Sequence, residues 1–294
     1  MECRMLHTSL VALAFTIFGL CVGSFLNLCI DRLPLDQSIV APPSHCPSCG
    51  RRVSALDLVP FFNYLWLRGR CSYCRAPIPI RLPLVELLTG TLFALLYWHF
   101  GWSGELGMAL FYAALLIVIF FIDLEHQLIL DKVSYPGIVA AFAFSFLWPH
   151  SGWPDSGVLN AMIGGAIGFA IFVPPIIGYR AYHAYHGRAG PSHQGHEDDT
   201  VSQAEADADV LREGIGRGDL KLGLMIGLMV GNPEVLVACL LGMIGGGVVA
   251  VLLLALGIRG RRDPIPFGPF LCVSGMVALL WGRDIIDWYT GGFD

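Results

Sequence analysis

Long apolar stretches, separated by shorter polar segments, run along almost the whole chain of 294 residues. A helix needs about 17 to 25 apolar residues to cross the hydrocarbon core of a bilayer. Seven stretches reach or approach this length: residues 8–30, 84–100, 105–122, 134–149, 157–179, 233–257 and 267–282. An eighth, 220–231, is short and could cross only as a tilted or broken helix that packs against its neighbours. The pattern predicts an all-α polytopic membrane protein with about eight transmembrane helices.

The first apolar stretch is interpreted as a membrane span and not as a cleavable signal peptide. A single Arg precedes it, its apolar part is longer than that of a signal peptide, and no small-residue cleavage site comes before Asp31. We therefore expect residues 1–30 to form the first transmembrane span.

Lys and Arg are concentrated in alternate loops between the predicted spans. Basic loops remain on the cytoplasmic side of a membrane. If the N-terminus lies outside, four loops are cytoplasmic and hold 16 of the 18 bases. These loops are residues 31–82, 123–133, 180–221 and 258–266. The distribution therefore predicts the orientation of every span.

The composition agrees with a membrane protein and locates the net charge. Apolar residues make up 55% of the chain and charged residues 14%, whereas a soluble domain has about 25% charged residues. With a net charge of only −5, this excludes a disordered chain, a disulfide-rich secreted scaffold and a nucleic-acid-binding protein. Residues 181–214 hold seven acids and two bases while the other residues balance, so the whole acidic excess belongs to this polar segment.

Four cysteines in the loop 31–82 form two Cys-x-x-Cys motifs, Cys46–Cys49 and Cys71–Cys74. Two such motifs at this separation can present four thiolates tetrahedrally, which is the arrangement of a structural zinc site. The alternatives are disulfides, which a reducing cytosol disfavours, redox chemistry, which does not normally use a matched pair of motifs, and cysteines without a common function. We expect one zinc ion per chain, bound by all four cysteines, in a small cytoplasmic zinc-binding loop domain. The remaining cysteines are interpreted as small packing residues.

Two aspartates lie at the predicted cytoplasmic ends of spans. Asp123 ends the third span, and Asp219 opens the short one within Gly216-Arg-Gly-Asp-Leu-Lys221. Ionisable groups at membrane depth are costly and usually functional. Gly216 and Gly218 would allow a tight bend and a close approach to a substrate. Lys221 could either act on Asp219 or extend to the lipid headgroups.

A pair of carboxylates in one site indicates acid–base chemistry. Both cannot ionise readily, so one keeps a proton while the other acts as a base toward water. This is the chemistry of an aspartic protease, and we expect Asp123 and Asp219 to be its catalytic residues. Each has a structural alternative, because Asp219 could cap a helix and Asp123 could pair with Lys132. Asp131 is an alternative acid, and Glu125 could either enter the site or be solvated.

Together these residues resemble the type IV prepilin peptidases, which are membrane aspartic proteases of the GxGD class and also N-methylate their products. The resemblance runs nearly end to end and includes both Cys-x-x-Cys motifs. The other motifs that carry it are Gly23-Ser-Phe-Leu-Asn27, Arg32-Leu-Pro34, Arg81-Leu-Pro-Leu-Val-Glu86, Ile122-Asp-Leu-Glu-His-Gln127, Gly216-Arg-Gly-Asp-Leu-Lys221 and Pro264-Ile-Pro-Phe-Gly-Pro269. Two features depart from the family pattern. Leu130 stands before Asp131 where the family commonly has Pro, and residues 181–214 look like an insertion.

The insertion is polar and contains four histidines in two His-x-x-His pairs. A solvated loop is favoured over a metal site, because the segment has little apolar periodicity. Its acidic charge could steer basic leader peptides toward the site. The histidines are His183, His186, His193 and His196.

The resemblance implies that Asp123 and Asp219 cut the basic leader from type IV prepilins or type II secretion pseudopilins. It also implies methylation of the new N-terminus with S-adenosylmethionine. We assign this second reaction to residues 20–90 and name no methyl-transfer residue, because the chain has no dinucleotide-type glycine motif. The alternatives are a peptidase without methyl transfer, or a non-enzymatic membrane scaffold whose zinc loop docks a partner.

The expected organisation follows from these assignments. A first span at 1–30 precedes the zinc-binding loop at 31–82, and a peptidase domain at 83–294 contains the insertion at 181–214. The protein is expected in the bacterial cytoplasmic (inner) membrane, crossing it several times with the active site facing the cytoplasm. Its partners are then the lipid bilayer and prepilin-like substrates, with no nucleic acid.

Overall fold

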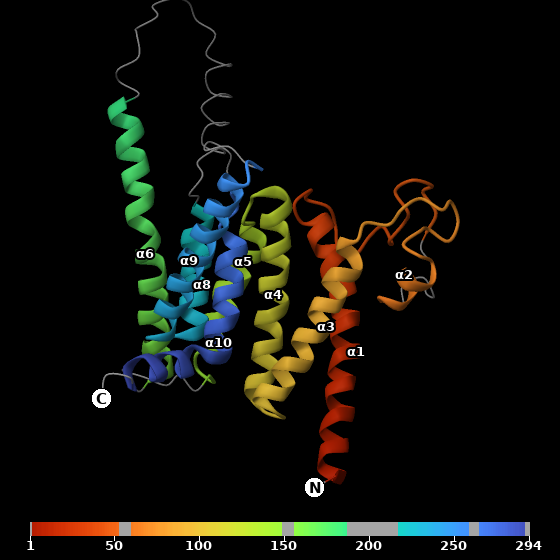
Figure 1. Cartoon of the computed structure of the whole chain (residues 1–294), viewed down its shortest axis with the longest axis horizontal. Coiled ribbons are helices and arrows are strands. Elements are labelled where there is room, and N and C mark those ends of the chain that lie inside the picture. The colour runs from red at the N-terminus through yellow and green to blue at the C-terminus, as the bar shows by residue number, and fades with distance from the viewer. Residues whose placement is uncertain (1, 53–59, 149–155, 187–216, 259–264, 292–294) are drawn as a thin grey trace, which may run out of the picture.

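The computed structural model describes residues 2–52, 60–148, 156–186, 217–258 and 265–291 (Figure 1). These residues form helices and contain no strand, only two isolated β-bridges in the cysteine-containing loop. The helices are α1 (Glu2–Arg32), α2 (Phe62–Trp66), α3 (Arg81–Phe100), α4 (Gly104–His126), α5 (Asp131–Phe144), α6 (Gly157–His186), α8 (Arg217–Val230), α9 (Glu234–Ala255) and α10 (Gly268–Gly291). The all-α prediction is therefore confirmed.

Six of these helices, α1, α3, α4, α6, α9 and α10, are long and apolar enough to cross a membrane. Two others, α5 and α8, have 14 residues each. Such a helix is about 21 Å long, which is shorter than a hydrocarbon core of about 30 Å. Each of the eight predicted spans thus corresponds to one helix. The predicted span 134–149, however, is a shorter helix, because α5 ends at Phe144.

The predicted insertion 181–214 begins within α6. This helix continues to His186, so residues 181–186 belong to it. Residues 187–216, which include Gly216 and the rest of the insertion, lie outside the described residues.

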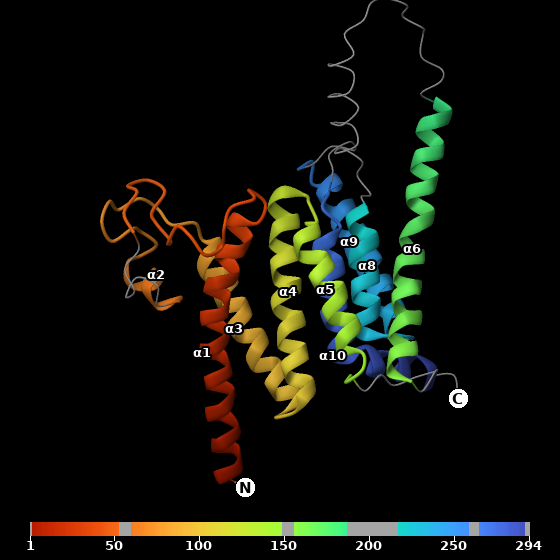
Figure 2. The ribbon, with the colours of Figure 1, turned by 180° about the vertical axis from the view of Figure 1, so that it is seen from behind.

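Helices α1 and α3 pack against each other on the side of α4 opposite the other helices (Figures 1 and 2). A Cβ atom added to Gly19 would lie 2.7 Å from Gly90 Cα, and one added to Gly23 would lie 2.7 Å from Glu86 Cα. Small residues that allow such a close approach are typical of helix pairs in membranes. The cysteine-containing loop with α2 extends from this pair away from the other helices (Figure 1).

Helix α8 packs against α6 through glycines on both helices. A Cβ atom added to Gly168 would lie 2.2 Å from the Gly223 carbonyl oxygen, and one added to Gly227 would lie 2.2 Å from the Gly164 carbonyl oxygen. The other contacts of α8 are with α5, α9 and α10, and its residue Met225 is fully buried. A helix enclosed by four others need not span the bilayer alone, which explains how a short helix is stable here.

The chain direction places the candidate functional residues at one end of the helix bundle. The last turns of α1 and α4 and the first turns of α3, α8 and α10 lie at the end opposite the N-terminus of the chain (Figures 1 and 2). This end carries Asp123, Asp219 and the cysteine-containing loop. Helix α10 packs against both α4 and α8, so it lies between the helices that carry the two aspartates.

Candidate aspartate site and cysteine cluster

Asp123 lies in the last turn of α4. Gln127 follows it in a left-handed conformation with φ 53°, and the Gln127 N–H donates to the Asp123 carbonyl oxygen at 2.9 Å. This arrangement caps the C-terminus of the helix and fixes the Asp123 backbone. The Asp123 side chain is buried, with 5% exposed. A carboxylate is therefore held away from water at the end of a candidate membrane span.

The Asp123 carboxylate contacts the first residue of α10. A Cβ atom added to Gly268 would lie 2.6 Å from Asp123 Oδ2. Any larger residue at this position would displace the carboxylate. Oδ2 itself has no hydrogen-bond partner among the residues that the structure describes. This oxygen is therefore free to act on a ligand.

Asp219 lies in the first turn of α8 and is also buried, with 7% exposed. The N-terminus of a helix favours a carboxylate, because its backbone N–H groups and the helix dipole attract negative charge. A Cβ atom added to Gly218 would lie 2.8 Å from Ile129 Cβ. The close approach that Gly218 permits is thus to the connection between α4 and α5.

Cys272 of α10 lies within the electrostatic range of both aspartates. Its thiol is buried, and the charges of Asp123 and Asp219 both act on it electrostatically. Cys272 is one turn after Gly268, so the two residues lie on the same side of α10. The aspartates therefore converge on the first turns of α10, although 95 residues separate them in sequence. The interpretation of Cys272 as a packing residue agrees with its burial. The sequence did not indicate that Cys272 lies near the two aspartates.

The charged residues near the aspartates form ion pairs with partners other than Asp123 and Asp219. Lys221 pairs with Asp131 and lies 4.8 Å from the ring centroid of Tyr135. Lys221 is therefore paired with Asp131, although it shares a sequence motif with Asp219. Lys132 pairs with Asp36 and not with Asp123. The Asp131 side chain is 59% exposed, unlike the two buried aspartates.

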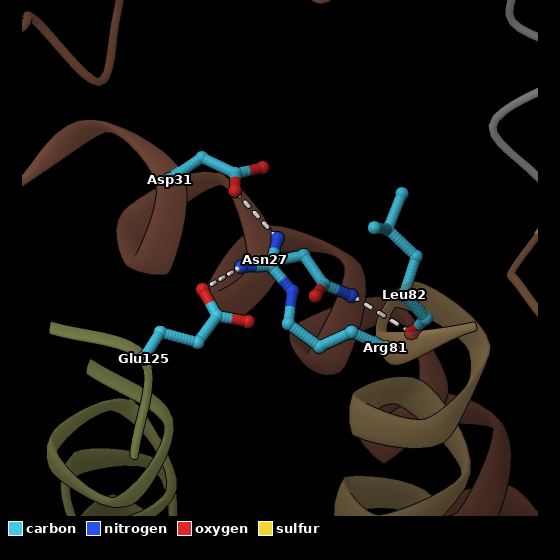
Figure 3. A network of polar contacts seen from close by, with 5 residues as sticks. All are labelled: Asn27, Asp31, Arg81, Leu82 and Glu125. Carbon is cyan, nitrogen blue, oxygen red and sulfur yellow. Dashed lines mark hydrogen bonds and ion pairs between the residues drawn. The ribbon is translucent and has the colours of Figure 1, made fainter. Parts of the chain in front are cut away.

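Arg81, the first residue of α3, joins α1 to α4. Its guanidinium donates to Asp31 Oδ1 at 2.5 Å and to Glu125 Oε2 at 2.7 Å (Figure 3). Glu125 is therefore paired with Arg81, while its side chain stays partly exposed to solvent. Because Glu125 is two residues after Asp123, this ion-pair network connects the end of α1 with the helix end that carries Asp123.

The four cysteines of the loop form one cluster. The sulfur atoms of Cys46, Cys49, Cys71 and Cys74 all lie within 4.8 Å of one another, and these four thiols are free. With Zn–S bonds of about 2.3 Å, the sulfurs of a tetrahedral zinc site are about 3.8 Å apart. The Cys46 and Cys74 sulfurs are 3.8 Å apart. The cluster therefore fits a tetrahedral metal ion.

Each Cys-x-x-Cys motif is a tight turn closed by backbone hydrogen bonds. The Cys46 N–H donates to the Arg51 carbonyl, and the Cys71 N–H donates to the Ala76 carbonyl, both at 2.9 Å. The residue after the second cysteine is left-handed in both motifs, with φ 68° at Gly50 and 62° at Arg75. The two turns are thus alike in conformation, and only the first uses the glycine that this conformation favours.

Two sulfurs of the cluster have pKa values that shift in opposite directions. The Ala76 N–H lowers the pKa of Cys74, but desolvation and hydrogen bonds with the other three cysteines raise it to about 11. Backbone N–H groups of Cys49 and Ser48 donate to the Cys46 sulfur and lower the pKa of Cys46 to about 6. Cys46 is therefore a thiolate at neutral pH, which is the form that binds a metal.

Two family models match the chain. The bacterial peptidase A24 N-terminal domain matches residues 17–100, which contain the second half of α1, the cysteine-containing loop and α3. The type IV leader peptidase family matches residues 110–251, which contain both aspartates. No solved structure matches the chain at a significant level.

Curated relatives that share the name prepilin leader peptidase/N-methyltransferase cover most of the chain. The protein from Myxococcus xanthus is 36% identical over 86% of this chain and 66% of its own length. The protein from Aeromonas hydrophila is 32% identical over 98% of this chain and 95% of its own length. The protein from Pseudomonas aeruginosa is 29% identical over 96% of this chain and 94% of its own length. With the buried aspartates and the cysteine cluster in place, the chain belongs to the type IV leader peptidase family.

Proposed function

We propose that this protein is a membrane aspartic endopeptidase that removes the leader of type IV prepilins and then N-methylates the new N-terminus. The observation that carries the peptidase is the pair of buried carboxylates, Asp123 of α4 and Asp219 of α8, that converge on the start of α10. The names of the relatives support both reactions. Pseudopilins of type II secretion are proposed as further substrates, because the resemblance implies the same leader.

One aspartate acts as the general base in hydrolysis and the other as the general acid. One carboxylate takes a proton from water as the water oxygen attacks the scissile carbonyl carbon, and the protonated partner donates to the leaving nitrogen as the C–N bond breaks. One proton is taken and one is given, so the pair returns to a shared-proton state. Burial excludes bulk water, which strengthens the electrostatic action of both groups on the reacting bond.

The substrate is proposed to lie with its apolar helix in the bilayer and its basic leader in the cytosol. The basic loops on the side of the aspartates support this orientation. An apolar groove of about 350 Å³ between α4, α9 and α10 begins beside the site, and Leu124, Pro269 and Val273 help to line it. Leu124 follows Asp123 directly and Pro269 follows Gly268, so the groove reaches the level of the Asp123 carboxylate along α4 and α10.

The metal is proposed to be one structural zinc ion bound by Cys46, Cys49, Cys71 and Cys74. Four sulfur ligands complete a tetrahedral zinc site and leave no open position for a substrate. The ion would therefore hold the loop in shape. Methyl transfer is proposed to use S-adenosylmethionine, whose sulfonium gives its methyl group to the free amine as the C–S electron pair returns to sulfur and the amine loses a proton.

The pair is tested by Asp123→Asn and Asp219→Asn, each compared with Asp131→Asn. Loss of an acid–base group costs about 10² to 10⁴ in rate, so we expect at least a hundredfold lower kcat for either variant. Asp131→Asn should retain more than half of the wild-type rate, because this side chain is exposed. Cleavage of a purified prepilin by protein in lipid nanodiscs, followed by mass spectrometry, measures the rates.

The same incubation with labelled methyl donor separates the two reactions. A cut but unmethylated product would restrict the protein to peptidase activity. Cleavage at wild-type rate by either aspartate variant would refute the catalytic pair, and no cleavage by the wild-type protein would favour a membrane scaffold.

A further inference from the structure

A second cavity lies between α1, the start of α3 and the cysteine-containing loop. Its volume is about 610 Å³, which is in the range of sites for small organic ligands, about 300 to 1,000 Å³. Asn27 of α1, Arg81 and Glu86 of α3 and Tyr73 of the loop line it. The lining residues all lie within residues 17–100, the part of the chain that matches the peptidase A24 N-terminal domain.

Two polar atoms in the wall of this cavity lack a partner. Asn27 is 5% exposed, and its Nδ2 donates to the Leu82 carbonyl oxygen at 2.9 Å (Figure 3). Its Oδ1 and the Nε of Arg81 are buried, and neither has a hydrogen-bond partner in the described part of the chain. Buried polar atoms are nearly always paired. One acceptor and one donor therefore remain for a ligand.

The geometry of Arg81 is fixed by its other nitrogens. Its two terminal nitrogens are held by Asp31 and Glu125 (Figure 3). The guanidinium is therefore anchored on both sides, and only Nε is left to bind a further group. A ligand that used Nε would meet a preorganised donor, which reduces the entropy cost of binding.

Glu86 gives the wall a buried negative charge. It is 8% exposed, and its Oε2 accepts the N–H of Phe61 at 2.7 Å. Among the described residues it forms no salt bridge. A buried carboxylate without a cationic partner is costly, and a positively charged ligand would remove that cost.

The other bases around the cavity are already engaged. Arg32 donates to the carbonyl oxygens of Ser38 and Pro42 at 2.8 and 2.6 Å, and Arg51 lies 5.1 Å from the ring centroid of Tyr73. His45, the other basic residue in the described lining, has Nδ1 3.3 Å from the Pro43 carbonyl oxygen. The charge of Arg81 is already balanced by Asp31 and Glu125, so a wholly anionic ligand such as a phosphate would meet the Glu86 carboxylate without a compensating charge from the described wall. The cavity favours a ligand with a positive charge.

We propose that this cavity binds S-adenosylmethionine and that Asn27, Arg81 and Glu86 are its principal binding residues. This inference rests on the proposed methyl transfer and locates it. The amino acid part of the ligand has an ammonium group for Asn27 Oδ1 and a carboxylate for Arg81 Nε. Glu86 would balance the sulfonium charge, and the ring of Tyr73 offers an aromatic surface for the adenine.

The charge on the ligand gives a sharp test. S-adenosylmethionine carries a sulfonium cation, whereas its product S-adenosylhomocysteine has the same shape without that charge. For Glu86→Gln we expect the Kd of S-adenosylmethionine to rise at least tenfold and that of S-adenosylhomocysteine to change less than twofold. Equilibrium dialysis with the full-length protein in nanodiscs measures both constants. Unchanged binding of the product also shows that the variant is folded.

Two further variants complete the test. Asn27→Leu removes the acceptor for the amino group, so it should weaken both ligands at least tenfold. Glu105→Gln removes the same charge as Glu86→Gln from the first turn of α4, outside the cavity, and should bind both ligands as the wild type does.

The outcomes distinguish the site from the function. If the wild type binds and transfers methyl groups but the Glu86 and Asn27 variants bind normally, the cavity is the wrong site while methyl transfer stands. If the wild type binds no S-adenosylmethionine, the inference is overturned. If binding follows the expected pattern but no prepilin is cut, the peptidase proposal fails and the binding site remains.

Discussion

The aspartate site and the cavity at the cysteine-containing loop handle buried polar groups in opposite ways. At the aspartate site the backbone closes on the functional group, since Gly268 leaves no room for a Cβ atom beside Asp123. At the cavity, about 610 Å³ of space faces Asn27 and Arg81, whose polar atoms lack partners among the described residues. Close packing suits a catalytic group that must not move, and open space suits a site that admits a whole cofactor.

The two regions also differ in what encloses them. The aspartates lie on helices that are packed on several sides, and α8 alone contacts α5, α6, α9 and α10. One wall of the cavity is a loop that contains only the short helix α2. The helices are stabilised by packing against one another, whereas we propose that a metal bound by the cysteine cluster holds the loop in shape. Ion pairs link the two regions: Arg81 pairs with Glu125 (Figure 3), and Lys132 of α5 pairs with Asp36, which follows α1.

The largest expected effect comes from filling the space beside Asp123. Gly268→Ala places a methyl group 2.6 Å from Oδ2, so the carboxylate must shift from its catalytic position. Displacement of a catalytic group by about 1 Å can cost a hundredfold in rate, and we expect at least this loss in kcat for prepilin cleavage. S-adenosylmethionine should bind as it does to the wild type.

Gly247→Ala of α9 is the matched control, because an added Cβ atom at this glycine meets nothing within 4 Å. It should cut at the wild-type rate. A normal rate for Gly268→Ala would show that cleavage does not depend on the observed position of the Asp123 carboxylate. Close packing would then not distinguish the aspartate site from the open cavity.

The sequence was sufficient for the helices and for the chemically distinctive residues. Apolar length predicts α1, α3, α4, α6, α9 and α10, because a membrane span must satisfy its own backbone hydrogen bonds. The cysteine motifs predict the cluster, because ligand spacing within a motif is local. The expectation that Asp123 and Asp219 share one end of the bundle also follows from counting spans.

The partners of these residues could not be read from the sequence. Gly268 is 145 positions after Asp123, and only the packing of α10 on α4 brings them into contact. Lys221 shares a motif with Asp219 but pairs with Asp131, because the start of α5 packs near the start of α8. The predicted span 134–149 is longer than α5, because the apolar residues after Phe144 continue the sequence pattern although the helix ends there. The division into domains at residue 83 stays a prediction.

Removal of the metal tests whether the cavity depends on the cluster. Cys46 and Cys71 both line the cavity, so the double variant Cys46→Ser, Cys71→Ser should lose the metal and loosen that wall. We expect metal content to fall from about one ion per chain to none by elemental analysis. The Kd of S-adenosylmethionine should rise about tenfold, with a smaller effect on cleavage.

The exposed Cys21 of α1 provides the control, because Cys21→Ser removes a thiol outside the cluster. It should leave both metal content and binding unchanged. A metal-free double variant that binds the methyl donor normally would separate the cluster from the cavity. An equal loss of cleavage and binding would show that the two regions are not independent.

The smallest expected effect concerns the apolar groove beside the aspartates. Val273 is 54% exposed and lines the groove, so Val273→Trp would fill part of the space proposed for the substrate helix. Loss of binding that is equal in the ground and transition states raises KM without changing kcat. We expect a KM about fivefold higher for full-length prepilin, and less than a twofold change for a soluble leader peptide that spans the scissile bond but lacks the helix. Val251→Trp, at an exposed position of α9 outside the groove, should alter neither. Equal effects of Val273→Trp on both substrates would instead place the substrate helix elsewhere and indicate a disturbance of Asp123 itself.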